Sequence, residues 1–227
     1  MIPSQRQGDA GARSSDIPAR RKGRDFVARH GETVFNAAHR LQGDAAHTPL
    51  TRAGFAQADE LGRALRELLG AKPALTLWAS PTGRALQTLA VICEHLELDW
   101  HVARTDARLV EIDMGSWGGR YYADLAAELG SIVLPGGILK HAPDGETYPD
   151  IAARVSAWLA DTADDPGDRL VIMHGISSRV MLGVMTGEPV DPSLGSSMAP
   201  GLPQGSVTLV TQGRATIPHY GTGFAPA

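Results

Sequence analysis

The chain of 227 residues holds a single cysteine, Cys93, which excludes a framework of internal disulfide bonds and suits a reducing compartment such as the cytoplasm. It has no run of about 18 uninterrupted apolar residues, so no membrane-spanning helix is predicted. Its formal net charge of −4 gives no reason to expect binding to nucleic acid. The 43% hydrophobic and 20% charged residues are typical of an ordinary soluble globular protein.

The motifs of several metal and cofactor enzymes are also missing. No HExxH sequence occurs, and the eight histidines are scattered without paired carboxylates at ligand spacing. No G-x-G-x-x-G sequence follows a predicted strand, and there is no phosphate-binding P-loop. We therefore expect neither a bound metal ion nor a cofactor.

Basic residues are concentrated at the start of the chain. Residues 1–24 contain six basic and two acidic side chains, a net charge of +4, so that the remainder carries −8. This stretch lacks the apolar run of a secretory signal, and its acids and prolines argue against the amphipathic helix of a transit peptide. We predict a disordered leader at residues 1–24, or a start codon placed too early, followed by a single domain over residues 25–227.

After the leader, apolar runs that predict strands alternate with segments of helical periodicity. Strands are predicted at residues 25–29, 74–80, 100–104, 169–175 and 206–212, and helices at residues 51–69, 80–96, 121–129, 147–163 and 176–187. Such alternation predicts an α/β fold, a three-layer sandwich whose mainly parallel central sheet is flanked by helices.

Capping residues predict where these helices begin and end. N-caps are expected at Thr51, Ser80 and Thr147, with Pro81 at a first helical position, Asp150 completing a capping box and Gly187 closing the last helix. The helix at residues 51–69 is expected to bury one face, formed by Phe55, Ala58, Leu61, Leu65 and Leu68.

Three of the predicted strands lead into residues suited to binding phosphate. The strand at 25–29 ends in Arg29 and His30, Arg84 lies one turn into the helix after the second strand, and the strand at 169–175 ends in His174 and Gly175. The carboxyl ends of parallel strands meet in one crevice, beside helix N-termini that favour anions. Arginine forks match phosphate oxygens, and histidine offers a nitrogen nucleophile near neutral pH. The sequence therefore predicts a phosphate pocket.

Each of these residues also has an ordinary interpretation when taken alone. Arg29 and His30 fit a solvated turn, Arg84 fits the surface of an amphipathic helix, and His174 fits a strand end. Their coincidence at three strand ends favours the pocket.

Seven segments strengthen this interpretation through their order in the chain: RHGETVFN, LQG, TPLT, SPTGRALQT, LVEIDMGSW, PDGET and VIMHG, between residues 25 and 212. In these segments the chain resembles the histidine phosphatase superfamily, in its phosphoglycerate-mutase-like branch. The resemblance implies the phosphoglycerate-mutase-like fold and a phosphohistidine enzyme that needs no metal. It implies His30 as the nucleophile, Arg29, Arg84 and His174 as ligands of the phosphoryl group, Asn36 as a further contact to the transferring oxygens, and Glu111 as the proton donor.

Glu111 has a rival in Asp113, two residues further on, and an exposed loop carboxylate is its ordinary interpretation. A carboxylic acid in this role would protonate the departing alkoxide and later deprotonate the attacking water. The chain departs from the family pattern at Gly118, where the phosphatases usually have Glu, and at His47, where an acid is usual before the TPLT segment.

Three functions fit these residues: hydrolysis of a small phosphorylated metabolite, a phosphoglycerate-type mutase reaction, and non-catalytic binding of a phosphorylated ligand. The short interval between Glu111 and the PDGET segment, and LQG in place of the mutase-like FTGW, favour the phosphomonoesterase. The complete set of site residues argues against a non-catalytic module.

Substrate specificity is expected from two segments that would cover the pocket, residues 131–149, with Lys140 and His141, and residues 188–204. The expected partner is a small phosphorylated substrate, and neither nucleic acid nor a membrane. The sequence is compatible with a homodimer and with a monomer.

Overall fold

A six-stranded sheet forms the centre of the computed structural model, which describes residues 21–134, 136–165 and 167–224. Its strands, in spatial order, are β10 (Arg214–His219), β9 (Val207–Thr211), β1 (Asp25–Arg29), β6 (Asp168–Met173), β2 (Leu75–Ala79) and β3 (Arg104–Thr105). Strand β6 pairs in parallel with β1 and β2, and β2 pairs in parallel with β3, whereas β9 and β10 are antiparallel. The predicted mainly parallel central sheet is confirmed.

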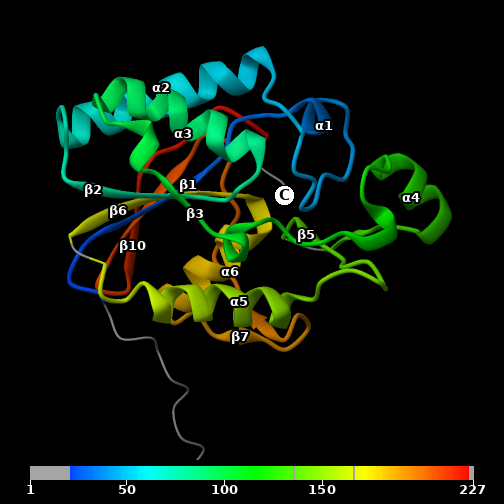
Figure 1. Ribbon diagram of the computed structural model, residues 1–227. Helices are drawn as coiled ribbons and strands as arrows, with labels where there is room; N and C mark the ends of the chain where they lie inside the picture. The colour runs from blue at the N-terminus through cyan, green and yellow to red at the C-terminus, as the bar shows by residue number, and fades with distance from the viewer. Residues whose placement is uncertain (1–20, 135, 166, 225–227) are drawn as a thin grey trace, which may run out of the picture.

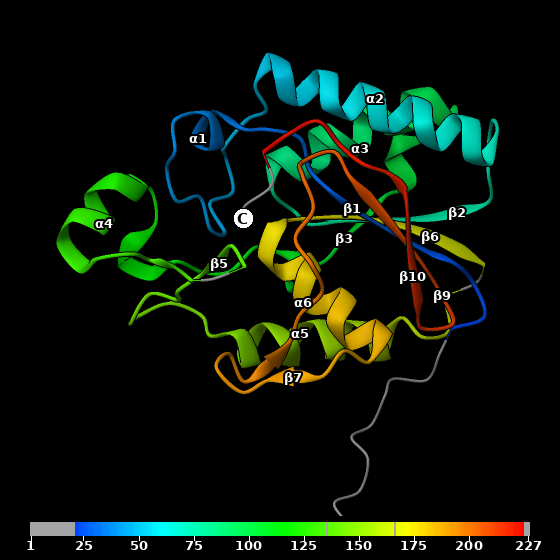
Figure 2. The same ribbon diagram turned by 180° about the vertical axis from the view of Figure 1, so that it is seen from behind.

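Helices cover both faces of this sheet, as Figures 1 and 2 show. Helices α2 (Arg52–Leu69) and α3 (Gly83–Leu96) lie on one face, and α5 (Tyr148–Asp161) and α6 (Gly175–Thr186) lie on the other. Successive side chains of a strand point to opposite faces. Phe26 and Ala28 of β1 accordingly pack with α2 and α3, whereas Val27 packs with α5 and α6. The predicted three-layer sandwich is therefore confirmed.

The shorter elements gather beyond the carboxyl end of β1, where α1, α4 and β5 lie in Figure 1. They are α1 (Val34–Ala37), α4 (Tyr122–Leu129) and the hairpin of β4 (Val133–Leu134) and β5 (Ile138–Leu139). The remaining elements are the 3₁₀ helices η1 (Trp100–Val102), η2 (Ala107–Leu109) and η3 (Gly115–Trp117), and the strands β7 (Val190–Asp191) and β8 (Ser196–Ser197).

Several predicted helix ends are confirmed. The side chain of Thr51 accepts a hydrogen bond from the Gly54 N–H group, and Thr147 and Asp150 form the predicted capping box of α5. Gly187 closes α6 with a φ angle of 72°. The prediction for α3 is wrong, because Thr82 occupies the N-cap position without a side-chain bond.

Two predictions for buried segments are also wrong. Residues 100–102 form a 3₁₀ helix rather than a strand, because the Asp99 side chain accepts a hydrogen bond from the His101 N–H group. In α2, Phe55 and Leu68 are 43% and 46% exposed. The buried face is shifted toward Gly54, where a Cβ atom would lie 2.0 Å from the Glu32 carbonyl oxygen. The missing side chain lets the helix approach this closely.

Strand β10 was not predicted, because most of its side chains are exposed and give no buried face. It follows a turn in which Gln212 and Gly213 have φ angles of 48° and 77°.

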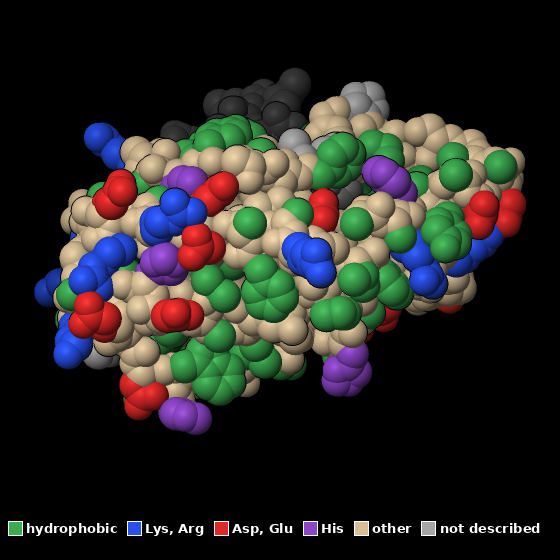
Figure 3. Space-filling model, turned by 90° about the horizontal axis from the view of Figure 1, so that it is seen from above, with side chains coloured by type: hydrophobic (Ala, Val, Ile, Leu, Met, Phe, Trp, Pro, Cys, Tyr) green, Lys and Arg blue, Asp and Glu red, His purple; other side chains and the backbone are tan. Residues whose placement is uncertain are grey.

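On the face seen in Figure 3, acidic and basic side chains lie side by side with apolar ones.

The predicted leader falls outside the described residues at positions 1–20. Arg21 and Arg24 are described, and they form ion pairs with Asp25 and Asp168 respectively. Within the described ranges, no helix is long and apolar enough to cross a lipid bilayer.

Candidate active site

The register of the parallel strands brings two histidines together. Arg29, the last residue of β1, is paired with Met173, the last residue of β6, so His30 and His174 leave the sheet at the same level. The backbone N–H group of His30 donates to the Met173 carbonyl oxygen at 3.1 Å. The centroids of the two imidazole rings lie 5.1 Å apart, with 66° between the ring planes. The predicted convergence of these histidines is thus observed.

Within the described residues, one ring nitrogen of His30 is committed to a hydrogen bond and the other is not. Nδ1 lies 2.7 Å from the Gly31 carbonyl oxygen. A carbonyl oxygen can only accept, so Nδ1 carries the proton and Nε2 keeps its lone pair. Burial and the charges of Arg84 and Arg29 hold the pKa of His30 well below 6.5. His30 is therefore neutral near pH 7, with Nε2 in the form that a nucleophile requires.

His174 has the opposite tautomer. Arg84 Nε donates to His174 Nδ1 at 3.2 Å, so the proton of the neutral ring is on Nε2. Burial and the positive charge of Arg84 lower the pKa of His174 well below 6.5. Nε2 is buried and has no hydrogen-bond partner within the described part of the chain. A buried donor without a partner lowers the stability of the fold. The His174 Nε2–H group is therefore suited to donate a hydrogen bond to a phosphoryl oxygen.

Arg84 is fully buried and holds the neighbouring loop as well as His174. Its Nη1 donates to the Ala45 carbonyl oxygen at 2.6 Å and to Thr48 Oγ1 at 3.0 Å, and its Nη2 donates to the Gly43 carbonyl oxygen at 2.7 Å. Burial lowers the pKa of Arg84 to about 10, so it remains charged near pH 7. Arg84 therefore contributes a fixed positive charge and the orientation of His174.

Arg29 lines the pocket directly and is tied to two distant segments. Its Nη1 donates to the carbonyl oxygens of Leu202, at 2.7 Å, and of Phe224, at 3.4 Å. Burial lowers the pKa of Arg29 to about 10, which leaves it charged near neutral pH. Of the predicted covering segments, residues 188–204 thus reach the site through the Leu202 backbone.

A helix cap orients the amide of Asn36. Its Oδ1 accepts hydrogen bonds from the Thr33 N–H group at 3.1 Å and from Thr33 Oγ1 at 2.9 Å, and Thr33 Oγ1 accepts one from the Asn36 N–H group. This capping box occupies the amide oxygen. The Nδ2 group is left to act as a donor in the pocket that Asn36 lines.

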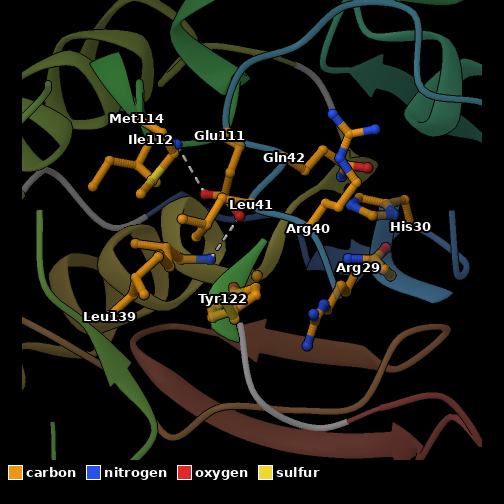
Figure 4. A pocket seen from close by; sticks show the side chains of 14 residues that line it. Arg29, His30, Arg40, Leu41, Gln42, Glu111, Ile112, Met114, Tyr122 and Leu139 are labelled. Atoms are coloured by element: carbon orange, nitrogen blue, oxygen red, sulfur yellow. Dashed lines mark hydrogen bonds between the residues drawn. The ribbon is translucent and has the colours of Figure 1, made fainter. Parts of the chain in front are cut away.

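Of the two candidate acids, Glu111 lines the pocket and Asp113 is exposed. Glu111 Oε1 accepts hydrogen bonds from the N–H groups of Ile112, at 3.0 Å, and Ser177, at 2.9 Å, and its Oε2 accepts one from Ile176 at 3.0 Å. Figure 4 shows two of these bonds as dashed lines. The carboxylate thus caps the N-terminus of α6, where negative charge is favoured.

The pocket contains about 400 Å³ of space, part of it open to solvent. It is lined by Arg29, His30, Asn36, Arg40, Leu41, Gln42, Gly43, Glu111, Ile112, Met114, Tyr122, Leu139, Gly175 and Ile176. Arg40, Gln42 and Tyr122 were not among the site residues predicted from the sequence. Gln42 lies in the quoted LQG segment, which could have marked it, whereas Arg40 and Tyr122 have no local signal.

Lys140 and His141 were predicted to cover this pocket, and that prediction is wrong. They line a separate hollow, together with Tyr148 and Leu194. Leu139 lines both hollows and is the contribution of residues 131–149 to the candidate site. His47 is exposed.

Within residues 21–134, 136–165 and 167–224, no three His, Cys, Asp or Glu side chains gather as metal ligands would.

The chain is similar to proteins of a known family. The family model described as "Histidine phosphatase superfamily (branch 1)" matches residues 26–216. The chain is 33% identical over 170 residues to "Probable phosphoglycerate mutase GpmB" of Citrobacter koseri, covering 72% of this chain and 75% of that protein.

Two solved structures are similar to the chain. The native structure of mycobacterial glucosyl-3-phosphoglycerate phosphatase has a TM-score of 0.69 and 25% identity, covering 91% of this chain and 100% of that one. The α-ribazole phosphatase from Shigella flexneri has a TM-score of 0.67 and 22% identity, covering 90% and 98% of the two chains. At 22% identity, the similarity to the α-ribazole phosphatase shows a shared fold alone.

Proposed function

Because the chain belongs to the histidine phosphatase superfamily, we propose that it hydrolyses a small phosphorylated metabolite through a phosphohistidine intermediate on His30. The observation that carries this proposal is the pair of neutral imidazoles, 5.1 Å apart between centroids. His30 offers an unprotonated Nε2, and His174 offers an Nε2–H group that has no partner in the described residues. A nucleophile beside an unused donor suits attack on phosphorus with stabilisation of its oxygens.

In the proposed first step, His30 Nε2 forms a bond to phosphorus as the bond from phosphorus to the ester oxygen breaks. Glu111, entering as the carboxylic acid, gives its proton to the departing oxygen. In the second step the Glu111 carboxylate takes a proton from water, whose oxygen bonds to phosphorus as the bond to His30 breaks. Inorganic phosphate leaves, and both residues return to their starting forms.

Fixed positive charge and donors supply the stabilisation in both steps. Phosphoryl transfer spreads negative charge over three equatorial oxygens, so that catalysis depends mainly on positioning and electrostatics. Arg29 and Arg84 provide two buried cations, and the Asn36 amide and His174 Nε2–H provide donors. These groups need no reorganisation during the reaction, because the strands, the α1 cap and the loop at residues 43–48 already hold them.

A mutase reaction is the second candidate, and the sequence relatives named as phosphoglycerate mutases favour it. The structural likeness to a phosphatase at 25% identity favours hydrolysis. Both reactions share the phosphohistidine, and they differ in whether water or a second hydroxyl group accepts the phosphoryl group.

The proposal is tested with His30→Asn, which removes the nucleophile but keeps a donor for the Gly31 carbonyl oxygen. Turnover of p-nitrophenyl phosphate in EDTA should fall by at least about 10³-fold, whereas His47→Asn, at an exposed histidine, should retain it. The wild type quenched in alkali during turnover should carry phosphate in an alkali-stable, acid-labile linkage. A parallel assay with phosphoglycerate separates release of inorganic phosphate from transfer between hydroxyl groups.

Full turnover by His30→Asn would contradict the proposed intermediate. A tenfold loss of wild-type activity in EDTA, restored by Mg²⁺ or Zn²⁺, would contradict the metal-independent class of enzyme.

A further inference from the structure

A second hollow lies beside the candidate active site and takes no part in the steps above. The β4–β5 hairpin, the start of α5 and the turn between β7 and β8 line it, and Figure 2 shows β5, β7 and the start of α5 on the same side of the molecule. It contains about 910 Å³ of space, part of it open to solvent, compared with about 400 Å³ in the candidate active site. Pockets for small organic molecules usually hold about 300–1,000 Å³. The hollow is therefore large enough for such a molecule.

The floor of this hollow is apolar and fixed in place. Leu139 and Tyr148 are each 2% exposed and belong to the hydrophobic core. The Tyr148 hydroxyl donates a hydrogen bond to the Leu139 carbonyl oxygen at 2.5 Å, which joins the hairpin to α5. Leu134, Pro149 and Leu194 add further apolar surface. A shape that exists before the ligand arrives needs little reorganisation on binding.

The wall formed by the turn between β7 and β8 is also held in place. The Asp191 carbonyl oxygen accepts hydrogen bonds from the N–H groups of Leu194, at 3.1 Å, and Gly195, at 2.8 Å. Gly195 has a φ angle of 68°, and a Cβ atom there would lie 3.2 Å from Pro149 Cγ. The backbone of the turn thus lies close to the start of α5.

Several polar side chains that line the hollow are already used by the protein. Thr147 Oγ1 donates to Asp150 Oδ2 at 2.5 Å, and Ser193 Oγ donates to Asp191 Oδ1 at 2.7 Å. His141 donates through Nδ1 to a neighbouring backbone carbonyl oxygen at 3.1 Å. No carboxylate is among the described residues that line the hollow, so these two aspartates lie outside it.

Lys140 differs from these side chains. Its backbone N–H group donates to the Ile132 carbonyl oxygen at 2.8 Å, which fixes its place in the chain after β5. Its ammonium group is exposed and makes no hydrogen bond or ion pair with any other part of the described chain. A lysine stem can lie along apolar surface while its charged end stays at the rim. One unpaired cation at the rim of an apolar hollow suits a ligand with an apolar body and an anionic group.

We propose that this hollow is a second binding site, which takes a small organic anion. The apolar body of the ligand lies on Leu139, Tyr148 and Leu194, and its anionic group pairs with Lys140. An aryl or medium-chain carboxylate has this chemistry. The inference does not depend on the proposed function, because Leu139 is the one described residue that this hollow shares with the candidate active site.

Two fluorescent dyes with the same aromatic body test the charged half of the proposal. 8-Anilino-1-naphthalenesulfonate carries a sulfonate, and N-phenyl-1-naphthylamine carries no charge. The wild type should bind the sulfonate at one saturable site. Lys140→Met should raise the Kd of the sulfonate by about 3- to 10-fold, the size expected for a partly exposed ion pair, and leave that of the neutral dye unchanged. Lys140→Arg should keep most of the affinity. Lys72→Met, at an exposed lysine after α2, has the same net charge as Lys140→Met and should match the wild type.

Two further titrations locate the dye. Leu194→Asn should weaken binding of both dyes, because the apolar body loses part of its wall, and far-UV circular dichroism checks that this variant is folded. Orthovanadate, an analogue of phosphate, should leave the affinity for the sulfonate unchanged. Displacement by orthovanadate would place the dye in the candidate active site and overturn the proposal. Absence of saturable binding, or equal Kd values for the sulfonate in the wild type and Lys140→Met, would also overturn it.

Discussion

Acidification should destabilise this protein through His30 and His174. Both side chains are almost completely buried, and burial and the nearby arginines hold both pKa values well below 6.5. In the unfolded chain each imidazole takes up a proton as the pH falls through about 6.5. Below that pH the unfolded state binds more protons than the folded state, so the free energy of unfolding decreases as the pH falls. The contribution of the two neutral histidines to the free energy of unfolding is fully present above pH 6.5.

The size of the effect follows from the number of buried histidines. Each one lowers the free energy of unfolding by about 1.4 kcal/mol per pH unit below 6.5, until its lowered pKa is reached. His30 and His174 together contribute a slope of about 2.7 kcal/mol per pH unit. While both folded imidazoles stay neutral, each pH unit below 6.5 therefore removes a large part of the roughly 5–15 kcal/mol that stabilises a typical domain.

Urea unfolding between pH 7.5 and pH 5 measures this slope. His30→Gln and His174→Gln should each reduce this slope by about 1.4 kcal/mol per pH unit relative to the wild type. Each variant lacks one imidazole that takes up a proton when the chain unfolds. The exposed His47 supplies the control, His47→Gln, since its imidazole reaches water in folded and unfolded chains alike. Slopes that are the same in the wild type and in both variants would refute the assignment of these histidines as neutral and buried.

Two further predictions concern the other site residues. Arg84→Met should lower the free energy of unfolding by about 3 kcal/mol, because it leaves the buried Gly43 carbonyl oxygen and the half-buried Ala45 carbonyl oxygen without donors. Urea unfolding that matches the wild type would show that water replaces the guanidinium. Glu111→Gln should slow hydrolysis of an alkyl phosphate by about 10²–10⁴-fold and that of p-nitrophenyl phosphate much less, because only the alkoxide needs a general acid. Equal losses on both esters would exclude Glu111 as the acid, whereas Asp113→Asn should change neither rate.

The sheet and the meeting of its strand ends could be predicted because both depend on local patterns. Every residue of β1 is buried, as are all but the first residue of β6, which is typical of strands covered on both faces. Once the strands are parallel, His30, Arg84 and His174 have to approach each other at one edge. No knowledge of distant contacts is needed for that step.

The rest of the pocket depends on contacts between distant segments. Arg40 reaches it beside Gly119, which is 79 positions away in the chain. The side on which Lys140 and His141 lie depends on how the β4–β5 hairpin packs near the start of α5. The tautomer of His174 depends on its bond from Arg84. None of these contacts has a periodicity or a cap that the sequence could reveal.

Under the proposed function, Asn36 meets two separate demands with the two ends of one amide group. For the start of α1 only the oxygen matters, so an aspartate would cap the helix as well. For a phosphoryl group only the nitrogen matters, and an aspartate would offer it a repelling charge. Selection for stability alone would thus accept several residues at position 36, whereas selection for phosphate binding accepts few. Drift at this position can abolish turnover in a chain that still folds, and a stability screen would not detect the loss.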